Sequence, residues 1–369
     1  MGVIEDQIAE IEDEIRRTQK NKATNAHIGR LKAKIALLRI AREKAGKGGG
    51  GGGLGYAVRK SGHATVALVG YPSVGKSTLL THLTGAESAA AAYEFTTTTI
   101  IPGMLSWRGA AVQILDMPGL IPGASKGRGR GREVISVARG ADLIFFLLDK
   151  DHLEFRSLLA ELEQAGIRVN GRPPKIVVTA LERGGVEVHS TVKLTKIDIE
   201  TAQGIAKEFR VHNGSIVFRQ DATPDELIDV LAGNRVYIPG ILVMNKADLI
   251  PASERPAIVA RLSPWKPVFV SAQKESGFLE LKEAMSEALA FIRVYVKPPG
   301  QPPDMAEPVI LRKGDSVDSL LKRLPPELGL SFKSALVWGK SARFPGQTVG
   351  REHSLADQDI VTVTIQRGA

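Results

Sequence analysis

The sequence predicts an α/β protein whose parallel sheet is accompanied by an N-terminal helical hairpin, an inserted α+β domain and a C-terminal β-grasp-like module. Three observations predict it. β-like segments alternate with helical stretches, six consecutive glycines occupy 48–53, and one connection between strands is about 90 residues long, where a crossover helix needs far fewer. A chain of 369 residues is also longer than one core usually serves, so several domains are expected.

The hairpin is predicted by two apolar stripes at helical spacing, with a polar turn around 20–25 between them. The stripes are Ile4, Ile8, Ile11 and Ile15, then Ile28, Leu31, Ile35 and Leu38. From 16 to 47 the only acid is Glu43. The basic residues there are Arg16, Arg17, Lys20, Lys22, Arg30, Lys32, Lys34, Arg39, Arg42, Lys44 and Lys47. Such a run is often a solvated face, but its single sign favours contact with phosphates.

Segments rich in β-formers predict the strands of the sheet at 65–69, 112–115, 143–148, 241–244 and 268–270. The inserted domain accounts for the long connection, with β-like pieces at 176–179, 186–188 and 216–218. A helix should open at Thr223, because Glu226 stands at capping-box spacing and Pro224 at the first helical position.

After a proline-rich stretch at 297–308, strands at 309–311, 335–338 and 360–365 and a helix near 317–324 predict the C-terminal module. The expected domains are 1–55 for the hairpin and glycine linker, 63–172 with 236–296 for the sheet domain, 173–235 for the insertion, and 300–369 for the last module.

Composition limits the function classes. The net charge of +9 favours polyanionic partners such as RNA or nucleotide phosphates, although it also fits simple solubility. Without cysteine there are no disulfides or thiol-ligated metals. The apolar run 143–148 is far below the roughly 20 residues of a membrane helix, and no secretory signal is present. We therefore expect no membrane partner, no disulfide partner and a cytoplasmic location.

A complete phosphate-binding loop follows the first strand, as its mechanism requires. Its residues are Gly70, Tyr71, Pro72, Ser73, Val74, Gly75, Lys76 and Ser77, with Thr78 next. Backbone amides would cradle the phosphates, Lys76 would reach the β and γ oxygens, and the Ser77 hydroxyl would bind Mg²⁺. The alternative, a glycine turn followed by a chance Lys-Ser pair, lacks this strand and helix context.

Two further segments are expected near the γ-phosphate. Asp116 ends an apolar strand and would lie beside the Mg²⁺, while Gly119 would sense the phosphate. One threonine of 96–99 would complete the metal shell, and Thr97 is favoured, although the run could simply be an edge strand. Lys76, Thr97 and Gly119 are the candidate catalytic residues.

Base specificity is predicted by Asn245, Lys246 and Asp248 after a later strand. The Asp248 carboxylate can accept two hydrogen bonds from guanine, a donor pair that adenine lacks. The backbone of the short segment Ser271, Ala272 and Gln273 would approach the guanine carbonyl. We therefore expect GTP or GDP with Mg²⁺ as the ligand and a P-loop GTPase domain around the sheet.

Hydrolysis should be slow, because Leu120 and Ile121 stand where a glutamine would orient the attacking water. A partner, a cation or the basic loop could assist; the loop residues are Lys126, Arg128, Arg130 and Arg132. Two other function classes share some of these features: a phosphotransferase or metabolic ATPase, which would not need Asp248, and a mainly structural RNA-binding protein with weak nucleotide turnover.

Together these motifs resemble the developmentally regulated GTP-binding proteins, a branch of the Obg-related GTPases. The resemblance covers nearly the whole chain, and its most specific stretches are 18–34, 116–139, 233–238 and 335–340. It implies an inserted domain like domain 2 of ribosomal protein S5 and a C-terminal TGS domain. It also implies action on ribosomes or structured RNA in translation, and an accessory protein that activates the GTPase.

The same resemblance bears on two sites. The family spacing places the switch threonine at Thr97. Many potassium-using relatives carry asparagine at the position of Ser73, so K⁺ stays an open cofactor here.

Overall fold

The computed structural model describes residues 2–19, 21, 24–45, 60–85, 101–117, 131–326 and 332–365. It divides into two compact units. One contains the helical hairpin and the inserted domain (1–55, 125–128 and 161–237), and the other contains the large sheet and the C-terminal module (56–124, 129–160 and 238–369). The predicted α/β class is confirmed.

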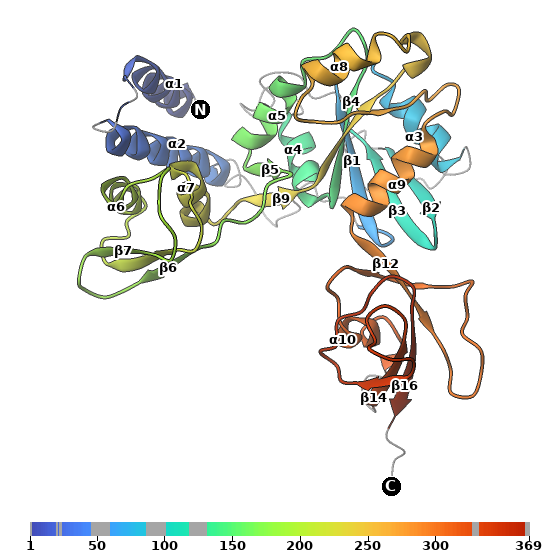
Figure 1. Cartoon of the computed structure of the whole chain (residues 1–369). Helices are drawn as coiled ribbons and strands as arrows, with labels where there is room; N and C mark the ends of the chain where they lie inside the picture. The colour runs from blue at the N-terminus through green and yellow to red at the C-terminus, as the bar shows by residue number, and fades with distance from the viewer. Residues whose placement is uncertain are drawn as a thin grey trace. The chain divides into compact units, whose positions relative to one another are not determined.

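The large sheet has the strand order β11-β10-β4-β1-β3-β2, and all its pairs are parallel except β2 with β3. Helices flank it (Figure 1). Its elements are β1 (Ala64–Gly70), α3 (Lys76–Thr84), β2 (Ile101–Trp107), β3 (Ala110–Asp116), α4 (Gly131–Gly140), β4 (Leu143–Leu148), α5 (Phe155–Gln164), β10 (Gly240–Met244), the 3-10 turn η3 (Ala247–Leu249), α8 (Arg255–Arg261), β11 (Val268–Phe269) and α9 (Phe278–Ala288). All five strands expected from the sequence are present.

The central strands are buried on both faces, which is typical of parallel sheets covered by helices. Every residue of β1 and of β4 is buried. On one face, Leu68 of β1 and Phe145 of β4 share a core with Leu79 of α3 and Leu281 of α9. This packing fixes the carboxyl ends of β1, β3, β4 and β10 at one edge, where ligands of open α/β sheets bind.

The C-terminal module is a five-stranded mixed sheet in the order β13-β12-β16-β14-β15. Its elements are β12 (Phe291–Val296), β13 (Val309–Arg312), α10 (Val317–Leu321), β14 (Phe332–Trp338), β15 (Gln347–Val349) and β16 (Asp359–Ile365). Leu320 of α10 packs into its core with Val337 and Val361. Because β12 pairs with β13 and β16, this sheet begins before the proline-rich segment.

The inserted domain has a three-stranded sheet in the order β6-β8-β7, covered by α6 and α7. The elements are β6 (Ile176–Ala180), β7 (Val186–Ser190), α6 (Ile199–Glu208), β8 (Gly214–Phe218) and α7 (Pro224–Ala232), with the short pair β5 (Ile167–Val169) and β9 (Val236–Ile238) alongside. The capping box of α7 is confirmed. The Thr223 hydroxyl accepts the Glu226 amide at 3.3 Å, and the Glu226 carboxylate accepts the Thr223 amide at 2.7 Å.

The hairpin consists of α1 (Gly2–Arg17) and α2 (Asn25–Ala45), and α2 packs against α6 and α7 (Figure 1). Ala33 and Ala36 lie inside the core of the inserted domain. Gly29 permits the close approach, since a Cβ there would lie 2.8 Å from Cγ2 of Thr201. The hairpin and the inserted domain therefore share one core.

In the part of the chain that the structure describes, every helix is too short or too polar to cross a bilayer.

Candidate nucleotide-binding site

The loop at 70–77 has the backbone of a phosphate cradle. It leaves β1 at Gly70 and enters α3 at Lys76, with left-handed backbone at Ser73 (φ 64°) and Gly75 (φ 91°). Glycine is required at position 70, because a Cβ would lie 2.5 Å from the Leu147 carbonyl oxygen of β4. Successive amides in such a turn, followed by a helix N-terminus, create an anion-binding concavity.

Lys76 is folded back over this loop. Its ammonium donates to the carbonyl oxygens of Tyr71 at 2.8 Å and Gly70 at 3.3 Å, and its side chain is buried. Burial lowers the pKa of Lys76, and the nearby charge of Asp116 partly opposes this. The ammonium is thus placed at the mouth of the loop by bonds that phosphate oxygens can replace.

Ser77 and Asp116 meet, although 39 positions separate them in the sequence. The Ser77 hydroxyl donates to one carboxylate oxygen of Asp116, while the other is buried without a hydrogen-bond partner among the described residues. Burial raises the pKa of Asp116, and the bond from Ser77 and the charge of Lys76 oppose the shift. A hydroxyl beside a half-satisfied buried carboxylate fits the oxygen ligands that Mg²⁺ prefers.

Asn245 connects three sequence segments. Its Nδ2 donates to the Val74 carbonyl of the phosphate loop at 2.9 Å, and its Oδ1 accepts the Ala272 amide at 3.0 Å. The side chain is buried, and a Cβ on Gly75 would lie 2.4 Å from its Nδ2. The phosphate loop, the Asn245 motif and the 271–273 segment are therefore assembled as one site.

Asp248 and Ser271 complete this side of the site. A hydrogen bond from Ser271 lowers the pKa of Asp248, so its carboxylate remains ionised at neutral pH. Ser271 and Ala272 are buried and Gln273 is exposed. An ionised acceptor beside buried backbone is suited to a ligand edge with two N–H donors.

Three models of known domains match the chain. One described as a 50S ribosome-binding GTPase matches 65–180, one described as the C-terminal region of that domain matches 183–291, and the TGS domain matches 292–365. The human developmentally-regulated GTP-binding protein 2 is 46% identical over 367 residues, covering 98% of this chain and 99% of the relative. The chain belongs to the developmentally regulated GTP-binding protein family.

Membership makes this chain a GTP-binding protein with a P-loop GTPase domain and a TGS domain. A GTP-binding protein from Methanocaldococcus jannaschii is 49% identical over 369 residues, covering 99% of this chain and 93% of that protein. The Arabidopsis thaliana developmentally-regulated G-protein 3 is 47% identical, covering 98% of this chain and 99% of that protein.

The structure does not describe every residue that the sequence predicts for the site. Thr97 and Gly119 lie outside the described residues, as does the basic loop except for the backbone of Arg132. Pro72 and Thr78 are exposed at the loop and on the first turn of α3. Reasoning from the sequence missed Asp149, which follows β4 at the same sheet edge as Asp116 and Asn245; its position after a buried strand was the available signal.

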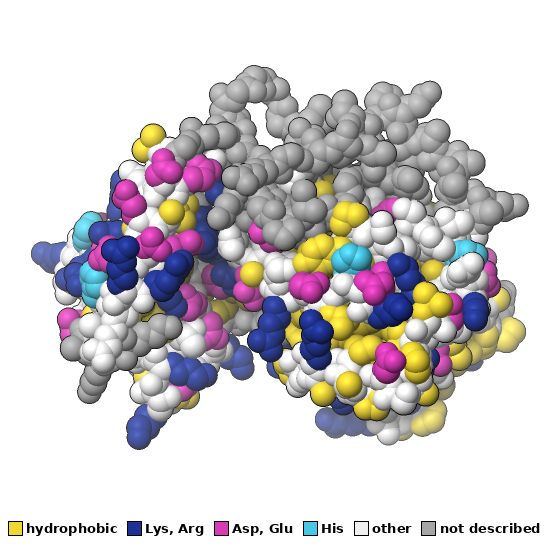
Figure 2. Space-filling view, turned by 90° about the horizontal axis from the view of Figure 1, so that it is seen from above, with side chains coloured by type: hydrophobic (Ala, Val, Ile, Leu, Met, Phe, Trp, Pro, Cys, Tyr) yellow, Lys and Arg dark blue, Asp and Glu magenta, His cyan; other side chains and the backbone are white. Residues whose placement is uncertain are grey.

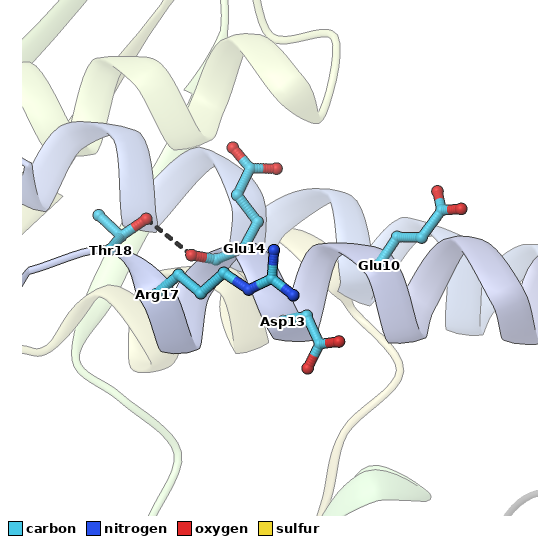
Figure 3. Close-up of a pocket in the computed structure, with 5 residues that line it drawn as sticks. All are labelled: Glu10, Asp13, Glu14, Arg17 and Thr18. Carbon is cyan, nitrogen blue, oxygen red and sulfur yellow. Dashed lines mark hydrogen bonds between the residues drawn. The ribbon is translucent and has the colours of Figure 1, made fainter.

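A hollow on α1 is a second concave feature, and it contains none of the candidate nucleotide residues. Figure 3 shows its lining side chains, which are Glu10, Asp13, Glu14, Arg17 and Thr18. The lining carries three carboxylates and a single guanidinium, so the hollow is unsuited to phosphate.

Proposed function

We propose that this chain binds Mg·GTP at 70–77 and 245–248 and hydrolyses it to GDP and phosphate as a slow switch. The observation that supports the proposal is the Asn245 side chain, which donates to the Val74 carbonyl of the 70–77 loop and accepts the Ala272 amide. In this scheme Asp248 selects guanine, and Lys76 neutralises charge on the phosphates.

Mg²⁺ would be held by Ser77 and Asp116, directly or through water, and would neutralise charge that develops on the phosphate oxygens. The orphaned oxygen of Asp116 supports this assignment. Thr97 and Gly119 are proposed to respond to the γ-phosphate. Since no glutamine follows Gly119, turnover should be roughly 10⁻⁴ to 10⁻² s⁻¹ without an activator.

Single-turnover hydrolysis and nucleotide titration test this site. Lys76→Ala and Ser77→Asn should abolish Mg-dependent GTP binding and turnover while the fold is retained. Thr81→Ala is the control, because Thr81 lies one turn further along α3 and its hydroxyl donates to the Ser77 carbonyl of the helix backbone at 3.0 Å. Hydrolysis at the parental rate in either site variant would refute the assignment.

We propose K⁺ as a candidate activator, which a comparison of turnover in KCl with turnover in NaCl tests. Ser73 lies in left-handed backbone, and its carbonyl accepts from Lys246 at 3.0 Å. Equal rates in the two salts would remove K⁺ from the scheme.

We further propose that the switch acts on ribosomes or structured RNA in the cytoplasm, with an accessory activating protein. The net charge of +9 and the description of the matching GTPase model support the ribosomal part, and the absence of cysteine fits a reducing compartment. The informative experiment is sedimentation with ribosomes in the presence of GDP or a non-hydrolysable GTP analogue. Equal recovery with both nucleotides would count against a nucleotide-dependent switch.

The basic hairpin offers fewer free cations than its sequence indicates. Arg39 pairs with Glu12 at 3.0 Å and Lys32 pairs with Asp225 at 2.6 Å. In Figure 2, Lys and Arg on this unit are interspersed with Asp and Glu. Arg30 and Lys34 of α2 are exposed and form no ion pair with a described residue, so they are the proposed phosphate contacts.

A further inference from the structure

Asp149 is a buried carboxylate at the centre of the candidate site. It directly follows β4, which lies between β1 and β10 in the sheet. β1 leads into the phosphate loop, and β10 leads into Asn245. The side chain of Asp149 is only 1% exposed, so it is positioned by the sheet between the two motifs.

One oxygen of Asp149 accepts from the Lys246 ammonium at 2.6 Å. The same ammonium donates to the Ser73 carbonyl of the phosphate loop at 3.0 Å. Burial alone would raise the pKa of Asp149, but hydrogen bonds from Lys246 and His152 outweigh burial and lower it. The carboxylate is thus ionised at neutral pH and fixes the lysine against the loop.

The other oxygen of Asp149 holds the segment that follows β4. It accepts the His152 amide at 3.0 Å and bonds Nδ1 of the His152 ring at 2.8 Å. That ring stacks on Tyr71 of the phosphate loop, with centroids 5.7 Å apart and planes at 25°. The Tyr71 hydroxyl is in turn 2.5 Å from the Ser157 hydroxyl on α5. Asp149 therefore reaches the phosphate loop by two separate routes.

We propose that Asp149 is a positioning residue for guanine-nucleotide binding, which acts by holding Lys246 against the phosphate loop. The inference rests on the proposed role of the 245–248 motif. Neither route involves the γ-phosphate, so loss of Asp149 should weaken GDP and GTP by the same factor. A merely structural ion pair would instead affect folding, and its effect on nucleotide binding would be independent of Lys246.

The test is a double-mutant cycle on nucleotide dissociation constants. Asp149→Asn removes the charge, but the new amide oxygen can still accept hydrogen bonds from the backbone amides. Lys246→Met removes the ammonium but keeps an unbranched side chain of similar length. Each should weaken GDP and GTP about 10- to 100-fold, since hydrogen bonds between charged groups are the stronger ones. In the Lys246→Met background, adding Asp149→Asn should change the dissociation constant of GDP or of GTP by less than about threefold.

Asp151→Asn is the matched control, because Asp151 is the exposed neighbour and loses the same charge. It should bind nucleotide like the parent. Asp149→Glu is the second variant; it keeps the charge and should bind more tightly than Asp149→Asn. For each variant, the fraction of folded protein is measured by circular dichroism and by the number of nucleotide-binding sites at saturation.

The outcomes are separable. If Asp149→Asn weakens binding equally in the parent and in Lys246→Met, or if Asp149→Glu binds no better than Asp149→Asn, the positioning role is refuted. If Asp149→Asn binds like the parent while Lys246→Met is impaired, the inference fails and the proposed base motif stands. If Lys246→Met binds like the parent, the proposed role of the motif fails as well.

Discussion

Replacing Gly75 with alanine tests whether the phosphate loop and the base motif function as one unit. The added Cβ would lie 2.4 Å from Nδ2 of Asn245, closer than non-bonded atoms can approach. The Asn245 side chain must then move, which removes its 2.9 Å bond to Val74 and its 3.0 Å bond from Ala272.

The two effects of this substitution have different sizes and different targets. Two lost hydrogen bonds of about 1 kcal/mol each should weaken GDP and GTP alike by roughly 30-fold. The left-handed backbone at φ 91° adds strain of about 1 to 2 kcal/mol, which lowers the free energy of unfolding rather than the affinity of the folded site.

Gly85→Ala separates the clash from the strain. Gly85 ends α3 with φ 80°, and a methyl group added there would have no described heavy atom within 4 Å beyond its chain neighbours. Both variants should lose stability in urea unfolding, but only Gly75→Ala should lose nucleotide affinity in calorimetric titration. Equal dissociation constants for the two variants would show that the motifs do not depend on this contact.

Three further perturbations follow from the site and the hairpin. Because burial raises the pKa of Asp116, its ionised form opposes folding, so Asp116→Asn should raise the melting temperature of the nucleotide-free protein at pH 7. That gain should vanish below pH 3.8, the ordinary carboxyl value, and Mg-dependent GTP binding should be lost; a lower melting temperature at pH 7 would contradict the reasoning. Asp248→Asn should weaken GTP binding roughly 30- to 1,000-fold in calorimetric titration, because one hydrogen-bond acceptor becomes a donor. An unchanged dissociation constant for GTP would disprove the base assignment. Arg30→Gln with Lys34→Gln should reduce the slope of log affinity against log salt for structured RNA by about 2, whereas the exposed pair Arg261→Gln with Lys266→Gln should not; equal slopes would make α2 a solvated face.

The strands, the α7 cap and the positions of the loop residues could be predicted because they depend on local chemistry. An apolar run followed by Gly70 to Ser77 is typical of a strand, a phosphate loop and a helix. Both hydrogen bonds of the Thr223–Glu226 capping box form within one helical turn. Asp149 was missed because its role depends on Lys246, which is 97 positions away in the sequence, and no short motif predicts a contact over that separation.

Among the elements that escaped prediction, β2 and α6 did so for related reasons. The strand β2 starts at Ile101 and contains Pro102 and Gly103, which are poor strand formers, but its antiparallel pairing with β3 overrides that preference. The helix α6 contains Gly204 and is stabilised by packing on α2 and by the Asp198 cap, whose carboxylate accepts the Thr201 amide at 2.7 Å. In both cases tertiary contacts outweigh the local sequence preference.

The alanines of α2 that lie in the core of the inserted domain bear on how truncated proteins should be made and interpreted. Removing 1–45 would take Ala33 and Ala36 out of the core that they share with Ile205 and Ile228, and would expose part of that core to water. Loss of ribosome or RNA binding by such a fragment would then report a damaged neighbouring domain as much as a missing hairpin. Conversely, a fragment expressed for study of the inserted domain should include α2, joined to 161–237 by a designed linker, so that its apolar face stays covered.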